Sequence, residues 1–290
     1  MEQPRRGHLA RQITPAYDRN NAQLYVGDCV EVMAALPAES VDAIVTSPPY
    51  AMQRKSTYGG IPEAEYPAWT VAWMDEARRV LKPDGSVIIN IRPHIKGGVI
   101  SDYVLRTRLA LRDDGWAELE ELIWYKKGGA PLGSTKRPRR SWESLLWYGK
   151  HGKAHADPKG AGPLTVRVGL TPGSRGWGEY VKPSQRNGNV RPPEPVRARA
   201  SDVAVLSTRL NEKSNGLNDH PAPFPWQLAE WCGKLITPPG GTILDPFNGS
   251  ASTGVAALRN GWHYIGIDAV PEYIEMSGRR LDHCAKELAA

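Results

Sequence analysis

The feature that most constrains the fold of this chain is an alternation of strand-like and helix-like apolar patterns on either side of its central region. Seven short apolar runs predict strands, at residues 24–27, 41–45, 86–91, 119–125, 144–148, 242–244 and 263–267. Helical periodicity predicts helices at residues 30–36, 66–81, 101–112, 226–236, 252–259 and 271–288. Strands that alternate with helices imply right-handed crossovers, so we predict an α/β fold with a mostly parallel sheet and helices on both faces.

Residues 242–268 indicate a site for a nucleoside cofactor. A predicted strand leads into Asp245-Pro246-Phe247-Asn248-Gly249-Ser250, a helix follows, and the next strand ends at Asp268. Gly249 can adopt turn conformations that other residues resist, and the helix N-terminus presents free N–H groups to a ligand carboxylate. An acid at the end of the second strand can accept hydrogen bonds from ribose hydroxyls. The sequence lacks the three-glycine dinucleotide pattern and the Walker lysine, which disfavours NAD and ATP. A tight turn without a ligand is the structural alternative.

Thr46-Ser47-Pro48-Pro49-Tyr50 also follows a predicted strand directly. Two prolines stiffen this turn, so the Ser47 hydroxyl and the Pro48 carbonyl can both point outward as acceptors. Two acceptors on the N–H groups of an aromatic amine would pull its nitrogen towards tetrahedral geometry and aim the lone pair at an electrophilic methyl group. Tyr50 offers a flat face for a base extruded from a duplex. A rigid turn with no chemistry is the alternative. Ligands bind at the carboxyl ends of parallel strands, where both segments lie.

The net charge of +6 is unevenly distributed. Residues 126–200 carry +12 and the rest of the chain carries −6. Such a block fits a polyanionic partner, because neutralising phosphates releases counterions; a solvated basic loop region is the alternative. For the densest basic run we predict phosphate contacts by Lys136, Arg137, Arg139 and Arg140. Residues 151–200 hold 8 Gly and 7 Pro with little apolar periodicity, which is typical of a loop-rich attachment.

Other classes of protein are disfavoured by what the sequence lacks. It has no apolar stretch long enough to span a membrane, so we expect no membrane partner. Its N-terminus is polar and basic, unlike a signal peptide. The three cysteines, Cys29, Cys232 and Cys284, are far apart and not spaced as metal ligands, so we expect no disulfide framework and no metal. These features predict a cytoplasmic location, as in a bacterium or its phage.

Together the motifs resemble those of the DNA amino-methyltransferases in the Rossmann-like methyltransferase superfamily. Residues 46–50 look like the catalytic (Asp/Asn/Ser)-Pro-Pro-Tyr motif, and residues 245–250 look like the Asp-Pro-Phe-x-Gly-Ser cofactor loop. Residues 220–225 resemble the segment lining the methionine end of the pocket, and residues 27–29 resemble the segment near the cofactor adenine. The catalytic motif precedes the cofactor loop, which is the order of the beta class.

The resemblance implies a Rossmann-like seven-stranded sheet with a loop-rich basic target-recognition insertion. The implied segments are a tail (1–21), a catalytic half (22–150), a target-recognition region (151–215) and a cofactor-binding half (216–290). The cofactor would be S-adenosylmethionine, and the catalytic residues would be Ser47, Pro48, Pro49 and Tyr50. The cofactor-binding residues would be Asp28, Cys29, Thr46, His220, Pro221, Phe224, Asp245, Phe247, Gly249, Ser250 and Asp268. Ala251 departs from the family, which often has glycine there.

The implied reaction is site-specific methylation of cytosine N4 in duplex DNA, because Ser47 and Phe224 resemble residues of the cytosine-N4 enzymes. Adenine N6 is the alternative target. A DNA-binding module without catalysis and an RNA or protein methyltransferase of the same fold are the competing functions. The implied partner is double-stranded DNA, with a cognate restriction endonuclease as a further candidate partner and the protein a monomer or a weak homodimer.

Overall fold

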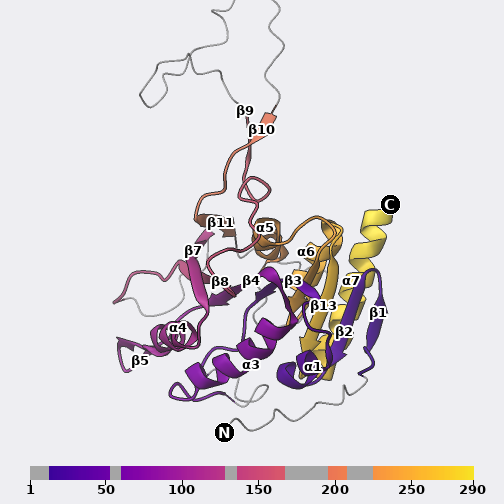
Figure 1. Ribbon diagram of the computed structural model, residues 1–290. Helices are drawn as coiled ribbons and strands as arrows, with labels where there is room; N and C mark the ends of the chain where they lie inside the picture. The colour runs from indigo at the N-terminus through magenta and orange to yellow at the C-terminus, as the bar shows by residue number, and fades with distance from the viewer. Residues whose placement is uncertain (1–12, 53–59, 128–135, 167–194, 208–224) are drawn as a thin grey trace, which may run out of the picture.

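The computed structural model describes residues 13–52, 60–127, 136–166, 195–207 and 225–290. Within these ranges, nine strands form one large sheet (Figure 1). Their order across the sheet is β1 (Tyr17–Arg19), β2 (Ala22–Val26), β13 (His263–Asp268), β12 (Thr242–Asp245), β3 (Val41–Thr46), β4 (Leu81–Ile91), β8 (Trp142–Gly149), β7 (Ala117–Lys127) and β11 (Val203–Ser207). The run from β2 to β4 is parallel, β8 is antiparallel to both of its neighbours, and β11 is parallel to β7. The predicted mostly parallel sheet is confirmed.

The sheet has two more strands than the predicted seven, and both additions lie at its edges. β1 pairs antiparallel with β2, although it falls in the predicted tail. β11 pairs with β7, although it falls in the predicted target-recognition region. Each is short and bounded by polar or turn-forming residues, so its apolar periodicity is too brief to be distinguished from that of a loop. The remaining small ladders pair β5 (Ile95–Lys96) with β6 (Val99–Ile100) and β9 (Leu164–Val166) with β10 (Pro195–Arg197).

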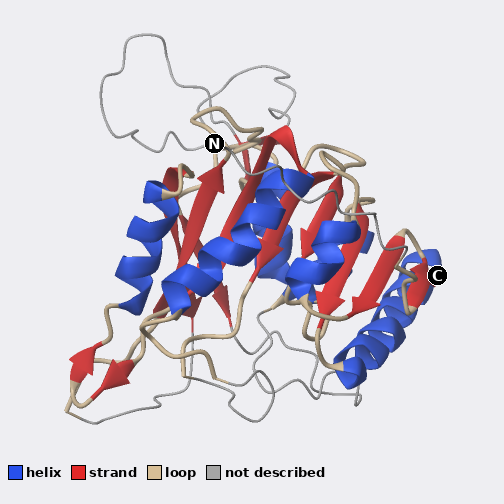
Figure 2. Cartoon of the chain, turned by 60° about the horizontal axis from the view of Figure 1, so that its bottom comes forward, coloured by secondary structure: helices blue, strands red, loops and turns tan. Residues whose placement is uncertain are grey.

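Helices cover both faces of the sheet, as predicted (Figures 1 and 2). One apolar core lies between the sheet and three helices: α1 (Cys29–Ala35), α3 (Tyr66–Val80) and α4 (Tyr103–Asp113). The other is formed with α5 (Trp226–Ile236), α6 (Ser252–Arg259) and α7 (Pro271–Ala289). No helix in the described ranges combines the length and the apolar character that crossing a membrane requires.

The direction of chain progression reverses at the centre of the sheet. β3 leads through α3 to β4 on one side, whereas β12 leads through α6 to β13 on the other. Since β3 and β12 are parallel neighbours, the loops that follow them diverge from adjacent carboxyl ends. Such a topological switch point opens a crevice at the edge of an α/β sheet, and ligands bind there. The two segments that the sequence singled out are the two that meet at this point.

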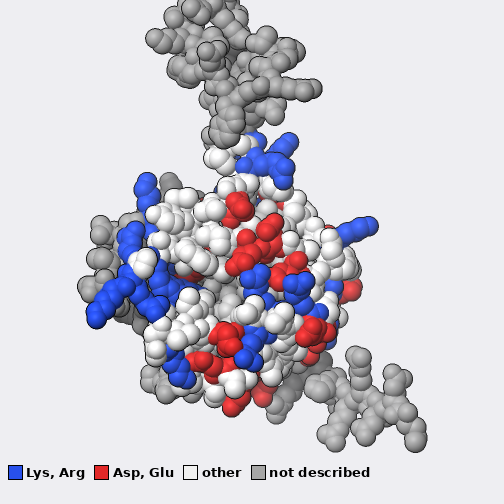
Figure 3. Space-filling view, turned by 90° about the vertical axis from the view of Figure 1, so that its left-hand side faces the viewer, with Lys and Arg blue, Asp and Glu red and all other residues white. Residues whose placement is uncertain are grey.

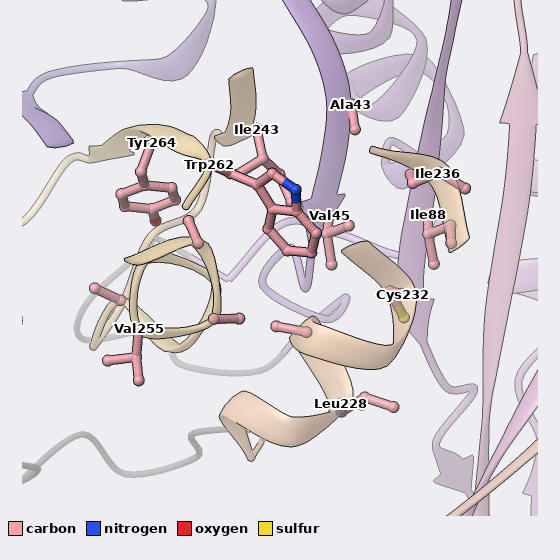
Figure 4. Packing of buried hydrophobic residues seen from close by; sticks show 14 of the residues in the cluster. Ala43, Val45, Ile88, Leu228, Cys232, Ile236, Ile243, Val255, Trp262 and Tyr264 are labelled. Atoms are coloured by element: carbon pink, nitrogen blue, oxygen red, sulfur yellow. The ribbon is translucent and has the colours of Figure 1, made fainter. Parts of the chain in front are cut away.

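The core beneath α5 depends on one close approach (Figure 4). The indole of Trp262 lies in a buried cluster with Ile243, Val45 and Cys232. A side chain at Gly233 of α5 would place its Cβ 2.5 Å from a ring carbon of Trp262. The glycine therefore lets the helix backbone rest directly on the indole.

We expect Gly233→Ala to lower the free energy of unfolding by roughly 1–3 kcal/mol, because overpacking forces the ring or the helix to shift. Urea denaturation measures the change. Gly152→Ala is the matched control, since nothing lies within 4 Å of a Cβ built there. Equal midpoints for the two variants would show that the indole moves aside at no cost.

Candidate active site

Thr46 and Asp245 join the two predicted functional segments. The Thr46 hydroxyl donates to Asp245 Oδ1 at 2.6 Å, and the two residues are the last of β3 and β12. Asp245 also accepts from the Thr253 hydroxyl at 2.9 Å and from the Phe247 amide at 3.1 Å. The Asp245 side chain is almost fully enclosed, with 1% of the residue exposed. The carboxylate thus fixes residues 46–50 (the predicted catalytic turn), residues 245–250 (the predicted cofactor loop) and the first turn of α6 relative to one another.

Burial raises the pKa of Asp245 to about 6, although its three hydrogen bonds act to lower the pKa. The folded protein therefore binds this proton more tightly than the unfolded chain does. The stability that the group contributes is fully present below its ordinary pKa near 3.8 and is lost as pH rises through 6.

We expect the stability of the native protein, measured relative to Asp245→Asn, to fall by roughly 2 kcal/mol between pH 4 and pH 7. Asparagine has the same shape as aspartate but does not titrate. The difference in stability between the two proteins therefore cancels the pH dependence that all other groups contribute. Urea unfolding of both proteins across this range measures the difference. A difference that stays constant with pH would contradict the raised pKa.

The cofactor loop is held by a second buried carboxylate. Gly249 has a φ of +51°, and its amide donates to Asp268 Oδ2 at 2.8 Å. Asp268 Oδ1 accepts from the Val270 amide at 3.0 Å, and only 2% of Asp268 is exposed. The residue expected to meet ribose hydroxyls thus also ties the loop to the end of β13.

Arg280 lies beneath this loop and was missed by the sequence reasoning. Its Nη1 donates to the Ser250 carbonyl at 2.7 Å and reaches the hydroxyls of Ser250 and Ser252 at 3.3 Å. Between those serines, Ala251 has a φ of +56°, a conformation that costs a residue with a Cβ roughly 1–2 kcal/mol. The departure from the family's glycine therefore falls on a strained position that Arg280 helps to hold. The sequence signal that could have identified Arg280 was a basic residue on the buried face of α7, beside Leu281.

The predicted adenine-side residues adjoin the same loop. Asp28 caps α1 by accepting from the Val30 amide at 2.9 Å and the Glu31 amide at 3.3 Å. The Gly27 amide donates to the Asp268 carbonyl at 3.0 Å, which brings this segment to the end of β13. Burial raises the pKa of Cys29 to about 12, so its thiol stays neutral and offers an apolar surface rather than a nucleophile.

An aromatic group lies beside the cofactor loop. The Phe247 ring is half-buried and lies 5.4 Å from the Trp69 ring and 5.3 Å from the Trp73 ring. The remaining predicted cofactor-binding residues, His220, Pro221 and Phe224, lie outside the described residues. Within the described ranges, no cluster of three or more His, Cys, Asp or Glu side chains could hold a metal ion.

The catalytic turn contacts two polar side chains that the sequence reasoning did not select. The Ser47 hydroxyl lies 3.5 Å from Asn90 Oδ1, and the Tyr50 hydroxyl donates to Glu143 Oε2 at 3.1 Å. Within the turn, Pro48 is buried and Pro49 is half-buried. A Ser47 O–H directed at Asn90 keeps the oxygen lone pairs available to accept from a substrate amine.

Glu143 is a buried acid surrounded by basic groups. It pairs with Lys126, and its Oε1 lies 3.8 Å from Arg92 Nη1. Burial, followed by the charge of Glu143, raises the pKa of Tyr50 well above its usual range, so the hydroxyl remains a donor. The sequence signals for these missed residues were polar side chains at predicted apolar strands: Asn90 lies within the predicted strand 86–91, and Glu143 directly precedes the predicted strand 144–148.

The described segments 136–140 and 151–162 of the basic block do not form one surface. Residues 136–140 precede β8 at the carboxyl edge of the sheet, where Arg140 donates to the Pro93 carbonyl at 2.6 Å and Arg137 donates to the Gly98 carbonyl. Lys136, Arg137 and Arg139 are exposed there. Residues 151–162 lie at the opposite edge, where the His155 amide donates to the Asp84 carbonyl at 2.8 Å. Figure 3 likewise shows basic side chains in separate groups. Of these two described parts of the block, the 136–140 segment is the one at the same edge of the sheet as the catalytic turn.

Comparison with known proteins decides the family. A sequence model of a DNA methylase family, the N6 and N4 methyltransferases, matches residues 41–279. The chain belongs to this DNA methylase family. The predicted family and its methyltransferase activity are thereby confirmed, and the cofactor, S-adenosylmethionine, is confirmed with them. The matched range covers both the catalytic turn and the cofactor loop.

Several bacterial relatives are similar over nearly their whole length. The type II methyltransferase M.PvuII of Proteus hauseri is 29% identical over 287 residues, which cover 92% of this DNA methylase and 85% of the relative. M.Cfr9I of Citrobacter freundii is 28% identical over 298 residues, with 90% and 88% covered.

Solved structures share the fold of this DNA methylase. The PvuII DNA methyltransferase, described as cytosine-N4-specific, superposes with a TM-score of 0.69 at 24% identity, covering 95% of each chain. A DNA modification methylase of Thermus thermophilus, complexed with S-adenosyl-L-methionine, has a TM-score of 0.55 at 24% identity, covering 90% of this chain and 95% of that one.

Proposed function

We propose that this DNA methylase transfers the methyl group of S-adenosylmethionine to the exocyclic N4 amino group of cytosine in duplex DNA. The observation that carries the proposal is the hydrogen bond between Thr46 and Asp245, which brings the catalytic turn and the cofactor loop together at the switch point of the sheet. The cytosine target rests on Ser47 at the start of the turn and on the similarity to a cytosine-N4-specific relative.

The residues of the pocket fit the cofactor. The N-terminus of α6 lies at the carboxyl edge of the sheet, directly after the cofactor loop, where the helix dipole suits a methionine carboxylate. Acidic groups at Asp28 and Asp268 suit a nucleoside, and Phe247 supplies an aromatic wall. When bound, S-adenosylmethionine supplies an electrophilic methyl group on its sulfonium.

The catalytic turn prepares the base for direct in-line transfer. The target base is flipped out of the duplex and stacks on Tyr50, whose hydroxyl Glu143 holds in place. The Ser47 oxygen and the Pro48 carbonyl accept from the two amino hydrogens, so the nitrogen lone pair turns towards the methyl group. The amine becomes acidic only once it is methylated, and it then releases its proton without a strong base.

The test is methylation of unmodified bacterial genomic DNA by the pure protein with tritiated S-adenosylmethionine, followed by nucleoside digestion and mass spectrometry. We expect N4-methylcytosine from the native protein and roughly a hundredfold less from Ser47→Ala in the same time. N6-methyladenine would retain the mechanism but overturn the assigned base. Tritium in added RNA or protein, and not in DNA, would overturn the proposed substrate.

The cellular location, the partners and the oligomeric state follow from the same proposal. The enzyme would act on double-stranded DNA in the cytoplasm, with a cognate restriction endonuclease as the partner that its type II relatives suggest. Marking one strand at a time requires a single active site, so a monomer or a weak homodimer suffices.

A further inference from the structure

A two-stranded hairpin exposes apolar side chains close to the candidate active site. β5 and β6 are joined by a turn at Gly97 and Gly98, and the pair stands clear of the main sheet, at the lower left of Figure 2. Val99 is 69% exposed and Ile100 is 58% exposed. Exposed β-branched residues on a projecting hairpin contribute nothing to the core, so their exposure requires another explanation.

The hairpin follows directly from the strand that supports the catalytic turn. β4 carries Asn90 beside Ser47 and Tyr50 and ends at Ile91, four residues before the hairpin begins. In that short connection, Arg92 faces Glu143, the acid that accepts from Tyr50. The base of the hairpin is therefore part of the wall that surrounds the turn.

One side of the hairpin is fastened by Glu63. The Ser101 hydroxyl donates to Glu63 Oε2 at 2.8 Å, and His94 Nε2 lies 2.8 Å from Glu63 Oε1. Lys96 Nζ lies 3.5 Å from the same Oε1. These contacts hold both strands of the hairpin to the segment that precedes α3.

The other side is fastened by the basic run. Arg137 donates to the Gly98 carbonyl in the turn, and Arg140 donates to the Pro93 carbonyl at the base. The hairpin, with Val99 and Ile100 exposed on its second strand, therefore projects from a basic frame that includes Lys96 and Arg137. These contacts on both sides hold the hairpin in a fixed position in the unbound protein.

We propose that the β5–β6 hairpin is a wedge that enters the minor groove of duplex DNA next to the target base, with Val99 and Ile100 contacting the base stack. Apolar wedges flanked by Arg and Lys are the means by which proteins unstack base steps from the minor groove. Extruding a base costs a few kcal/mol of pairing and stacking, and a wedge beside the opening would offset part of that cost. The inference rests on the proposed function, because it assumes a duplex substrate.

The charge around the tip favours DNA over a second copy of the chain. A twofold contact through the hairpin would bring Lys96 and Arg137 of each copy towards their own counterparts. Such like-charge contacts oppose self-association, whereas phosphates on both sides of a groove complement them.

The experiment compares Val99→Ser/Ile100→Ser with the native protein and with Leu288→Ser. Leu288 is 50% exposed on α7, near the other end of the sheet, so it controls for loss of exposed apolar surface. The substrates are two oligonucleotide duplexes carrying a site located by sequencing the native protein's methylated DNA. In one the target base is paired, and in the other it is mispaired.

We expect the double variant to methylate the paired duplex roughly tenfold more slowly than the native protein, and the mispaired duplex within about twofold of it. Thermal melting verifies that the variant is folded. Equal rates on the paired duplex would overturn the wedge while leaving the proposed function intact. A loss that is the same on both duplexes would also overturn it, as would dimers of the native protein, detected by sedimentation, that the double variant abolishes. No methylation by the native protein would instead refute the proposed function.

Discussion

Ser47→Ala is expected to lower the single-turnover methylation rate roughly a hundredfold or more, while the affinity for S-adenosylmethionine stays within about twofold of the native value. Removing one preorganised hydrogen-bonding group that acts on the reacting centre typically costs this much in rate. The Ser47 oxygen faces Asn90 in the catalytic turn and makes no contact with the cofactor loop. Rapid-quench methylation gives the rate, and calorimetric titration gives the cofactor affinity.

Two substitutions at Tyr50 separate its ring from its hydroxyl. Tyr50→Ala removes the stacking face and should lower turnover roughly 5- to 150-fold, since base–aromatic stacking contributes roughly 1–3 kcal/mol. Tyr50→Phe keeps the ring and loses the hydroxyl's bonds to Glu143 and Asn90, so it should retain most of the activity. Native turnover in Ser47→Ala or Tyr50→Ala would disprove the roles assigned to these residues.

Arg280→Met is expected to weaken cofactor binding at least tenfold and to lower the free energy of unfolding by roughly 2–4 kcal/mol. Methionine fills similar space but donates to neither serine, so the Ser250 carbonyl loses its partner in a buried site. The left-handed Ala251 would then be less constrained, and the first turn of α6 would shift.

Calorimetric titration and urea unfolding measure the two effects of Arg280→Met. Arg279→Met is the matched control, because Arg279 is the exposed neighbour on the same helix. Arg280→Lys, which can still donate to the Ser250 carbonyl, should recover part of the affinity. Equal affinities in Arg280→Met and Arg279→Met would show that the loop keeps its shape without the guanidinium.

Much of this architecture could be predicted from the sequence, because periodic patterns were long enough to define it. Helices α5 and α6 begin and end at the predicted residues, and every predicted strand belongs to the sheet. The junction of residues 46–50 with residues 245–250 could also be predicted, since parallel strands place their carboxyl ends at one edge. Edge strands β1 and β11 were missed because three to five residues carry little periodicity.

The supporting side chains could not be predicted in the same way. Glu143, Asn90 and Arg280 act through contacts with residues that lie 30 to 93 positions away, and no local motif specifies such pairs. Net charge also gave no information about position in space. The basic block was one segment in the sequence, yet the fold sends its described parts to opposite edges of the sheet.

The central position of β12 has a consequence for how the enzyme is made. β12 lies between β3, near the start of the chain, and β13, near its end, and β13 in turn pairs with β2. During synthesis the catalytic turn therefore emerges some 200 residues before the strand that completes its sheet, and contacts of such long range form slowly. A ribosome-bound chain that stops short of residue 242 has β4 on one side of β3, but no strand on the other side and no Asp245 for Thr46. The enzyme therefore cannot modify a genome until its last strands have been translated and folded.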